Sequence, residues 1–169
     1  MDHKQITWEA YKEACKRGSA RYLSLYEKSG HTKGFVSAQV DPRLFTEPFI
    51  MVKQGLELRS LQPNIMIKIP ATLSGVLSIL LLTALGVPTN ATLCFNMPQI
   101  RAVAEAVKRG KEIGESRGVD YSGWRSVITI MIGRYEDAKI FAEQAEERGI
   151  ELTEEMKRWA GLAVTKKAY

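Results

Sequence analysis

Four short segments of this chain carry apolar residues at every second position, the spacing that is typical of β-strands. They are residues 35–42, 64–72, 89–95 and 126–132. Elsewhere apolar residues recur at every third or fourth position, which predicts helices. The predicted helices cover residues 5–28, 46–60, 74–85, 98–118, 136–148 and 153–169. Strands that alternate with helices favour a parallel sheet, so the pattern predicts an α/β fold with about four parallel strands.

One predicted helix, residues 74–85, is apolar nearly all round, and no charged residue occurs between Lys68 and Arg101. Gly86 and Pro88 bound this helix, which falls well short of the roughly 20 apolar residues that cross a membrane. We therefore expect no membrane segment. The helix is expected to be buried on most sides or to face a partner chain.

Composition limits the possible functions. At 169 residues, with 45% hydrophobic and 25% charged residues, the chain has the make-up of an ordinary soluble globular domain. Its net charge of +5 is spread among interleaved acidic residues, so nothing indicates nucleic-acid binding. The cysteines (Cys15, Cys94) and histidines (His3, His31) are too few and too scattered for a disulfide framework or a metal centre. The start of the chain lacks a signal-peptide pattern, which makes the cytoplasm the expected compartment.

A lysine lies in the middle of the apolar segment 64–72. Alternation places Ile65, Ile67 and Ile69 on one face and Lys68 on the other. In a parallel β/α barrel the aliphatic face packs against helices and the other face looks into the barrel. Desolvation disfavours a charged ammonium group and yields a free amine that can attack a carbonyl. The alternative is a lysine at the mouth of the strand that reaches water or pairs with an acid.

The other predicted strands also place polar residues on the inward face. These residues are Gln39, Asn90 with Thr92, and Thr129, with Cys94 also predicted inward and Arg134 following the fourth strand. Chemistry in β/α barrels sits at the carboxyl ends of strands. A desolvated lysine among hydroxyl and amide groups, with an arginine for an anion, suggests Schiff-base chemistry on a phosphorylated carbonyl compound.

Four blocks of sequence resemble the transaldolase family. They are VSAQVDPR at 36–43, NIMIKIPAT at 64–72, NAT at 90–92 and GR at 133–134. The resemblance covers roughly residues 34–169 and implies a partial TIM (β/α) barrel, equivalent to strands three to six of the family's eight. Residues 1–33 then form a separate amino-terminal helical segment.

The resemblance also implies a reaction and roles for single residues. The family transfers a dihydroxyacetone unit between sugar phosphates in the pentose phosphate pathway, without a cofactor. Lys68 matches the lysine that forms the Schiff base with the donor ketose. Thr92 matches the threonine that holds the catalytic water, and Asn90 matches the inward asparagine beside it. Thr129 replaces a serine of the family, and Arg134 matches the arginine that grips the substrate phosphate.

Two departures from the family pattern bear on activity. Gln39 stands where the family has the glutamate that works through a water, and an amide cannot accept a proton at neutral pH. Loss of such a base typically costs about 10²–10⁴ in rate. Asp41 is the nearest substitute. The resemblance also implies residues on strands that this chain does not match. They are an Asp that serves as general acid/base in C–C cleavage, an Asn or Thr that orients the substrate, and a second phosphate-binding Arg. We therefore expect a fragment or a half-barrel.

An open sheet of four strands exposes two edges, which is a liability. We therefore expect two copies to pair as a homo-oligomer, or the amino-terminal helix to cover one edge, with the apolar helix 76–85 contributing to the contact. Two hypotheses follow. One is a transaldolase-like enzyme acting on sugar phosphates. The other is a catalytically inactive half-barrel that serves as a structural or oligomerising module.

Overall fold

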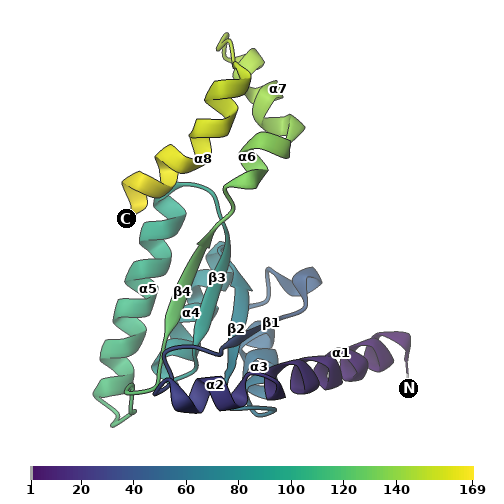
Figure 1. Ribbon diagram of the computed structural model, residues 1–169, viewed down its shortest axis with the longest axis vertical. Helices are drawn as coiled ribbons and strands as arrows, with labels where there is room; N and C mark the ends of the chain where they lie inside the picture. The colour runs from purple at the N-terminus through teal and green to yellow at the C-terminus, as the bar shows by residue number, and fades with distance from the viewer. Residues whose placement is uncertain (1) are drawn as a thin grey trace.

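The fold is a four-stranded parallel sheet with helices packed against one of its faces. The computed structural model describes residues 2–169 and orders the strands β1-β2-β3-β4 (Figure 1). The strands are β1 (Val36–Gln39), β2 (Ile65–Pro70), β3 (Thr89–Cys94) and β4 (Ser126–Ile130). Each neighbouring pair is parallel, as the sequence predicted for an α/β fold that forms part of a TIM barrel.

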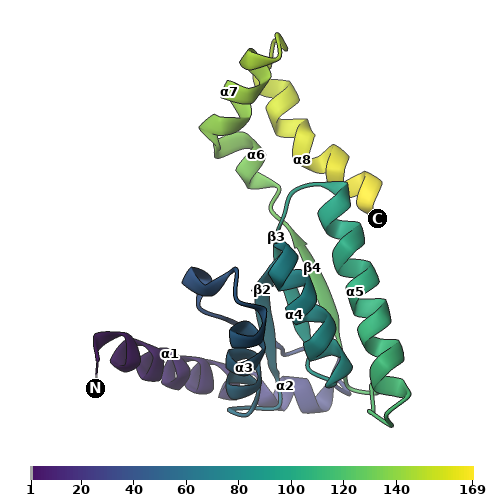
Figure 2. The same ribbon diagram turned by 180° about the vertical axis from the view of Figure 1, so that it is seen from behind.

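Helices connect the strands and continue beyond the sheet. They are α1 (His3–Ala20), α2 (Leu23–Lys28), α3 (Pro48–Arg59), α4 (Leu73–Ala84), α5 (Met97–Glu115), α6 (Gly133–Asp137), α7 (Lys139–Glu147) and α8 (Glu154–Ala168), with a 3₁₀ turn, η1 (Pro42–Leu44). Figure 2 shows α3 and α4 over one face of the sheet, with α5 alongside α4. Helices α6 to α8 extend past the carboxyl end of β4, and α8 returns to contact α5 (Figures 1 and 2).

The core lies between the sheet and these helices, and strand alternation builds it. Ile65, Ile67 and Ile69 are fully buried on the helix side of β2. Met51 of α3 and Leu82 of α4 are fully buried in the same cluster. Each such side chain contributes about 1.5–3 kcal/mol by leaving water. The helix side of the sheet is therefore aliphatic, and polar side chains are left for the opposite face.

A glycine allows α4 to begin directly behind the strand that carries Lys68. The Thr72 hydroxyl caps α4 by accepting a hydrogen bond from the Gly75 amide at 3.0 Å. A Cβ atom on Gly75 would lie 1.8 Å from the Pro70 carbonyl oxygen, so any larger residue would push the helix off the strand end. This close approach fixes the carboxyl end of β2.

The amino-terminal helix α1 covers the outer edge of β1. The Gln39 backbone amide, which faces away from β2, donates to the Tyr11 hydroxyl at 2.6 Å. Trp8 donates its indole N–H to Glu57 of α3 at 3.1 Å, and the Lys12 ammonium is also bonded to Glu57. The sequence predicted that the amino-terminal helix could cover one edge of the sheet. This prediction is confirmed at the edge of β1.

Two of the predicted helices are broken in the structure. The prediction of one helix over 5–28 is wrong, because the chain turns between α1 and α2. The Asn64 side-chain N–H donates a hydrogen bond to the Ser19 carbonyl at the end of α1. The Tyr26 ring of α2 stacks on the His31 ring. The helix predicted at 136–148 is likewise two helices, α6 and α7, separated by the extended residue Ala138.

The strand predicted over 35–42 is shorter than expected. It ends at Gln39 because the Asp41 carboxylate accepts the Arg43 backbone N–H at 3.0 Å and starts the turn η1. No helix in residues 2–169 combines the length and the apolar character needed to cross a membrane. The apolar helix α4 is instead flanked by α3 and α5, although Leu77 and Leu85 remain 41% and 51% exposed.

A β-bulge in β3 reverses the predicted direction of Cys94. The pairing of β3 with β4 shifts between Ala91 and Cys94, and Leu93 has a left-handed backbone with φ of 60°. This extra residue turns Leu93 to solvent and places Cys94, fully buried, in the aliphatic core. The prediction that Cys94 points inward is therefore wrong, and Thr92 is the last residue of β3 on the polar face.

Candidate active site

Lys68 lies at the centre of the polar face of the sheet. In the strand register it is opposite Gln39 of β1 on one side and Asn90 of β3 on the other. These three side chains share a face, because residues that pair in register in a parallel sheet point the same way. The structure therefore brings together three of the candidate residues from strands far apart in sequence.

The Lys68 side chain is half-buried and remains free of acidic partners. It takes part in none of the six ion pairs found among residues 2–169. The alternative in which Lys68 pairs with an acid is thus not found in this part of the chain. Its neighbours in register, Gln39 and Asn90, carry neutral amides, and neither compensates an ammonium charge.

Asn90 is held by hydrogen bonds on both sides of its amide. Its Nδ2 donates to the Ser37 hydroxyl of β1 at 3.0 Å, and its Oδ1 accepts from the Thr129 hydroxyl of β4 at 2.7 Å. The three side chains form a polar row across the face that Lys68 occupies. Ser37 is the site residue that sequence reasoning missed. Alternation places it on this face, but nothing in the sequence pairs it with a residue 53 positions away.

Thr92 lies next along β3 and is almost fully buried, with 4% of its surface exposed. Its hydroxyl is 3.9 Å from the Met131 sulfur, a weak acceptor, so most of its hydrogen-bonding capacity is free. Thr92 is paired in register with Pro70, two residues beyond Lys68. A water or substrate hydroxyl bound by Thr92 would therefore lie on the carboxyl side of the lysine.

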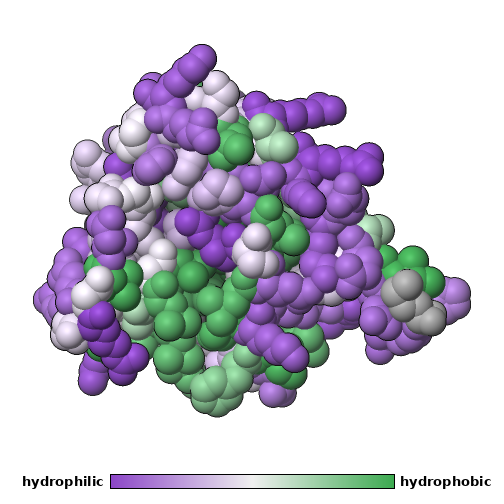
Figure 3. Space-filling view, turned by 90° about the horizontal axis from the view of Figure 1, so that it is seen from below, coloured by the Kyte–Doolittle hydropathy of each residue, from purple (hydrophilic) through white to green (hydrophobic). Residues whose placement is uncertain are grey.

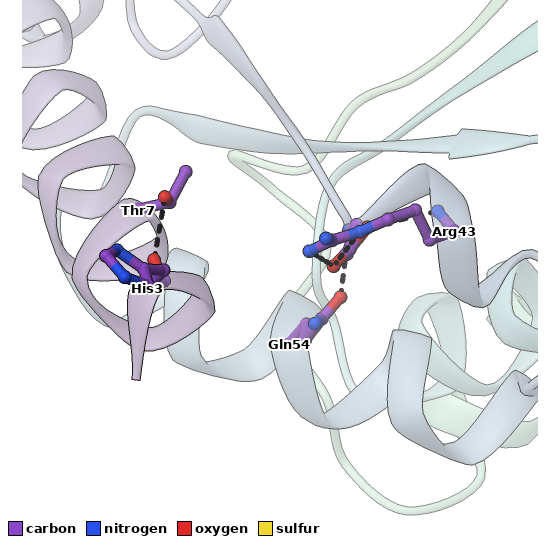
Figure 4. Close-up of polar contacts among 5 residues, drawn as sticks. His3, Thr7, Arg43 and Gln54 are labelled. Atoms are coloured by element: carbon purple, nitrogen blue, oxygen red, sulfur yellow. Dashed lines mark hydrogen bonds and ion pairs between the residues drawn. The ribbon is translucent and has the colours of Figure 1, made fainter. Parts of the chain in front are cut away.

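Asp41, the nearest substitute expected for the glutamate, is bound to Arg43. Its carboxylate accepts hydrogen bonds from Arg43 Nη2 at 2.6 Å and Arg43 Nε at 2.9 Å, and its backbone N–H donates to Gln54 at 2.9 Å (Figure 4). The side-chain hydrogen bond from Arg43 holds the pKa of Asp41 below its usual range. A lowered pKa makes the carboxylate a weaker base. The Gln39 side chain beside Lys68 is therefore not backed by a free carboxylate from this strand.

A cavity of about 660 Å³ opens between α1 and the end of β1. Figure 4 shows Thr7 on α1 across this space from Arg43 and Gln54. Gln39 is also part of the lining, together with the aromatic side chains of Trp8 and Tyr11. The cavity thus borders Gln39 at the carboxyl end of β1.

Arg134 lies apart from the other candidates. It is exposed on α6, beyond the carboxyl end of β4, and forms no ion pair with any of residues 2–169. Its neighbours Glu136 and Asp137 on α6 form no ion pair with it. The next residue, Tyr135, donates its hydroxyl to the Phe95 carbonyl and ties α6 to the loop that follows Thr92. The guanidinium therefore remains available to an anion.

Comparison with known proteins assigns the chain to a family. The sequence model of the family Transaldolase/Fructose-6-phosphate aldolase matches residues 3–169. The chain belongs to this family. It is 34% identical over 147 residues to Transaldolase 1 of Streptomyces avermitilis, covering 86% of the chain and 38% of that protein. It is 34% identical over 151 residues to a transaldolase of Thiobacillus denitrificans, covering 87% and 41%.

A third relative, Transaldolase 1 of Streptomyces coelicolor, is 37% identical over 112 residues, 65% of the chain and 29% of that protein. The chain therefore spans well under half the length of the curated transaldolases it matches. The family match begins at residue 3, so it includes α1 as well as the sheet.

The cysteines of this transaldolase-family chain have no part in the site. Both Cys15 and Cys94 are free thiols. Burial raises the pKa of the Cys94 thiol to about 11, which leaves almost no thiolate at neutral pH. Cys94 therefore packs as a small apolar residue in the core and does not reach the polar face.

Proposed function

We propose that this chain carries the Schiff-base part of a transaldolase reaction, with Lys68 as the nucleophile. The observation that carries the proposal is the position of Lys68, half-buried and free of acids, between Gln39 and Asn90. Its amine would add to the carbonyl of a ketose and lose water to give an imine. The protonated imine then accepts the electron pair when the bond between the third and fourth carbons breaks.

The reaction continues by transfer. Cleavage releases an aldehyde and leaves a three-carbon enamine on Lys68, which attacks the carbonyl of a second aldehyde. Hydrolysis of the new imine returns the amine. The net result is transfer of a dihydroxyacetone unit between sugar phosphates, as expected for cytoplasmic carbohydrate metabolism. Family membership and the intact lysine strand support this proposal over an inactive half-barrel.

The other candidate residues are proposed to bind the substrate. Asn90, oriented by Ser37 and Thr129, would hydrogen-bond a hydroxyl of the ketose close to the imine. Thr92 would hold the water that is lost and regained. Arg134 would bind the phosphate, because an unpaired guanidinium recognises that group through paired N–H donors. Each of these groups has a donor or acceptor left for the substrate or water that it is proposed to bind.

Two proton transfers are proposed to be slow. Cleavage requires loss of the proton from the hydroxyl on the fourth carbon, and the resemblance assigns that step to an Asp on a strand that this chain does not match. Gln39 cannot accept a proton in the water steps of imine formation, and Asp41 is bound to Arg43. Each missing base is expected to slow its step by about 10²–10⁴.

The test is to incubate the 169-residue chain with fructose 6-phosphate and an acceptor aldehyde and to follow release of glyceraldehyde 3-phosphate. We expect slow release that is absent in Lys68→Ala and in Lys68→Arg, which keeps the positive charge without a nucleophilic amine. Arg134→Gln should raise the ketose concentration needed for half-maximal rate. Release that continues unchanged in both Lys68 variants would overturn the assignment.

Self-association is the second part of the proposal. β4 ends the sheet, and none of the described strands lies beside its outer edge, whereas α1 covers the edge of β1. Val127 of β4 is 44% exposed. Apart from β4, Figure 3 shows an apolar patch within the largely hydrophilic surface seen from below. A second copy would bury such surfaces. Light scattering at micromolar concentration should give the mass of a dimer, and a monodisperse monomer would contradict pairing.

A further inference from the structure

Gln99, in the first turn of α5, uses its whole side-chain amide to bind backbone groups at the carboxyl end of the sheet. Its Oε1 accepts the Phe95 backbone N–H at 3.0 Å. Its Nε2 donates to the Ala71 carbonyl at 3.1 Å and to the Leu93 carbonyl at 3.3 Å. Ala71 directly follows β2, Leu93 lies near the end of β3, and Phe95 directly follows β3.

Three hydrogen bonds close a ring that contains the Ala71 backbone, the Thr92–Leu93 backbone and the Gln99 side-chain nitrogen. The Ala71 backbone N–H donates to the Thr92 carbonyl at 2.8 Å, so the Ala71 peptide is bonded to β3 through its N–H and to Gln99 through its C=O. Leu93, the residue after Thr92, is bonded to the same Gln99 nitrogen. Gln99 is thus the single side chain, among the described residues, that joins the ends of β2 and β3 at this point.

The ring supports a backbone conformation that the local sequence does not favour. Leu93 has φ of 60°, a left-handed conformation that a leucine rarely adopts. This conformation makes the bulge that sends Cys94 into the core and leaves Thr92 as the last inward residue of β3. A strained residue persists only where its surroundings hold it, and Gln99 binds the carbonyl of that residue.

We propose that Gln99 is a positioning residue, which fixes the Thr92 hydroxyl relative to the Lys68 amine by holding the Leu93 bulge and the Ala71 peptide together. The inference rests on the proposed function, because it assigns Thr92 and Lys68 to one reaction. The side-chain hydrogen bonds of Gln99 all go to backbone groups, and Gln99 is not a member of the polar row. Only an amide supplies the required set of two donors and one acceptor at this length.

The test compares Gln99→Glu and Gln99→Ala with Gln144→Glu, a matched change at an exposed glutamine of α7. The readout is the rate at which borohydride traps dihydroxyacetone on Lys68 between pH 5 and pH 8. An ionised carboxylate at position 99 can accept from Phe95 but cannot donate to either carbonyl. At pH 8 we expect Gln99→Glu and Gln99→Ala to lower the rate about tenfold, with Gln144→Glu unchanged.

Acidification separates positioning from a general loss of structure. The two carbonyls favour the protonated acid, so the ratio of the Gln99→Glu rate to the parent rate should rise toward one as the pH falls to 5. The ratio for Gln99→Ala should stay flat. Equal rates in the parent and both Gln99 variants would overturn the inference and leave the proposed function standing.

A second measurement is independent of the reaction. Hydrogen exchange of the Phe95 amide should be at least about tenfold faster in Gln99→Ala, or in the volume-matched Gln99→Met if the alanine variant fails to fold, than in the parent. Unchanged exchange would overturn the inference. If the parent itself forms no adduct, the proposed function fails, and the Phe95 exchange rate alone then decides whether Gln99 holds the bulge.

Discussion

The Thr129 hydroxyl donates to the Asn90 side-chain oxygen at 2.7 Å, across the edge of the face that carries Lys68. This bond fixes which end of the Asn90 amide is an acceptor and turns Nδ2 toward Ser37. The residues come from β4, β3 and β1, so only the folded sheet brings them together. The orientation of Asn90 is therefore a property of the sheet and can be tested by removing either neighbour.

Thr129→Val removes the donor while keeping the shape of the side chain. The Asn90 amide can then rotate, and we expect the rate of imine trapping on Lys68 to fall by about tenfold, the value of one hydrogen bond. Thr129→Ser, which keeps a hydroxyl at this position, should trap at nearly the parent rate. Borohydride trapping followed by intact mass measures both. Equal rates for the valine and serine variants would show that the Thr129 hydroxyl has no role.

Gln39→Glu should supply the missing base next to Lys68. A carboxylate there can move protons through the water that Thr92 is proposed to hold, so we expect imine trapping on Lys68 to become faster by about 10²–10⁴. Release of glyceraldehyde 3-phosphate should rise less, because cleavage also needs the Asp of the unmatched strand. Borohydride trapping and a steady-state assay of aldehyde release measure the two effects. A trapping rate that stays at the parent level would contradict a role of position 39 in the water steps.

The sequence predicts much of this arrangement, and the misses have local physical causes. Alternation of apolar and polar residues in 64–72 suffices to place Lys68 on one face of β2 and the isoleucines on the other, because β2 is regular and its helix side is aliphatic. The same rule fails for Cys94, because the bulge at Leu93 depends on Gln99 and on pairing with β4. Long-range bonds such as Tyr11 to Gln39 leave no trace in a local pattern. The roles proposed for the site residues come from the family resemblance, because periodicity predicts only which face a residue occupies.

Acid should weaken the bond that ends β1. The pKa of Asp41 is lowered in the folded chain, chiefly by its hydrogen bond from Arg43. The bond therefore stabilises fully above the unfolded value of about 3.9, and the contribution is lost as pH falls through the lower folded value. Because Arg43 is largely exposed, we expect the loss to be small. The free energy of unfolding, measured with urea at pH 7 and pH 2.5, should fall more in the parent than in Asp41→Asn, because Glu13, Glu57 and Asp120 also have lowered pKa values and titrate in both proteins.

Two glycine substitutions should shift stability in opposite directions. A Cβ on Gly114 would lie 1.9 Å from the Tyr121 hydroxyl and 2.9 Å from the Ala84 carbonyl, so Gly114→Ala should separate α5 from α4 at a cost of about 1–3 kcal/mol. A Cβ on Gly18, within α1, would meet nothing within 4 Å. Gly18→Ala should therefore stabilise by about 0.5–1 kcal/mol. Urea midpoints measure both, and a stabilised Gly114→Ala variant would contradict the packing described between α4 and α5.

The central claim, that Lys68 is a reactive amine, is tested most directly by borohydride reduction of the 169-residue chain with dihydroxyacetone, followed by peptide mapping. We expect one stable adduct, on the peptide that contains Lys68. It should be missing in Lys68→Ala, while Lys53→Ala, which removes an exposed lysine of α3, still forms it. A folded chain with no adduct at Lys68, or with adducts spread over exposed lysines, would contradict the claim and leave an inert half-barrel.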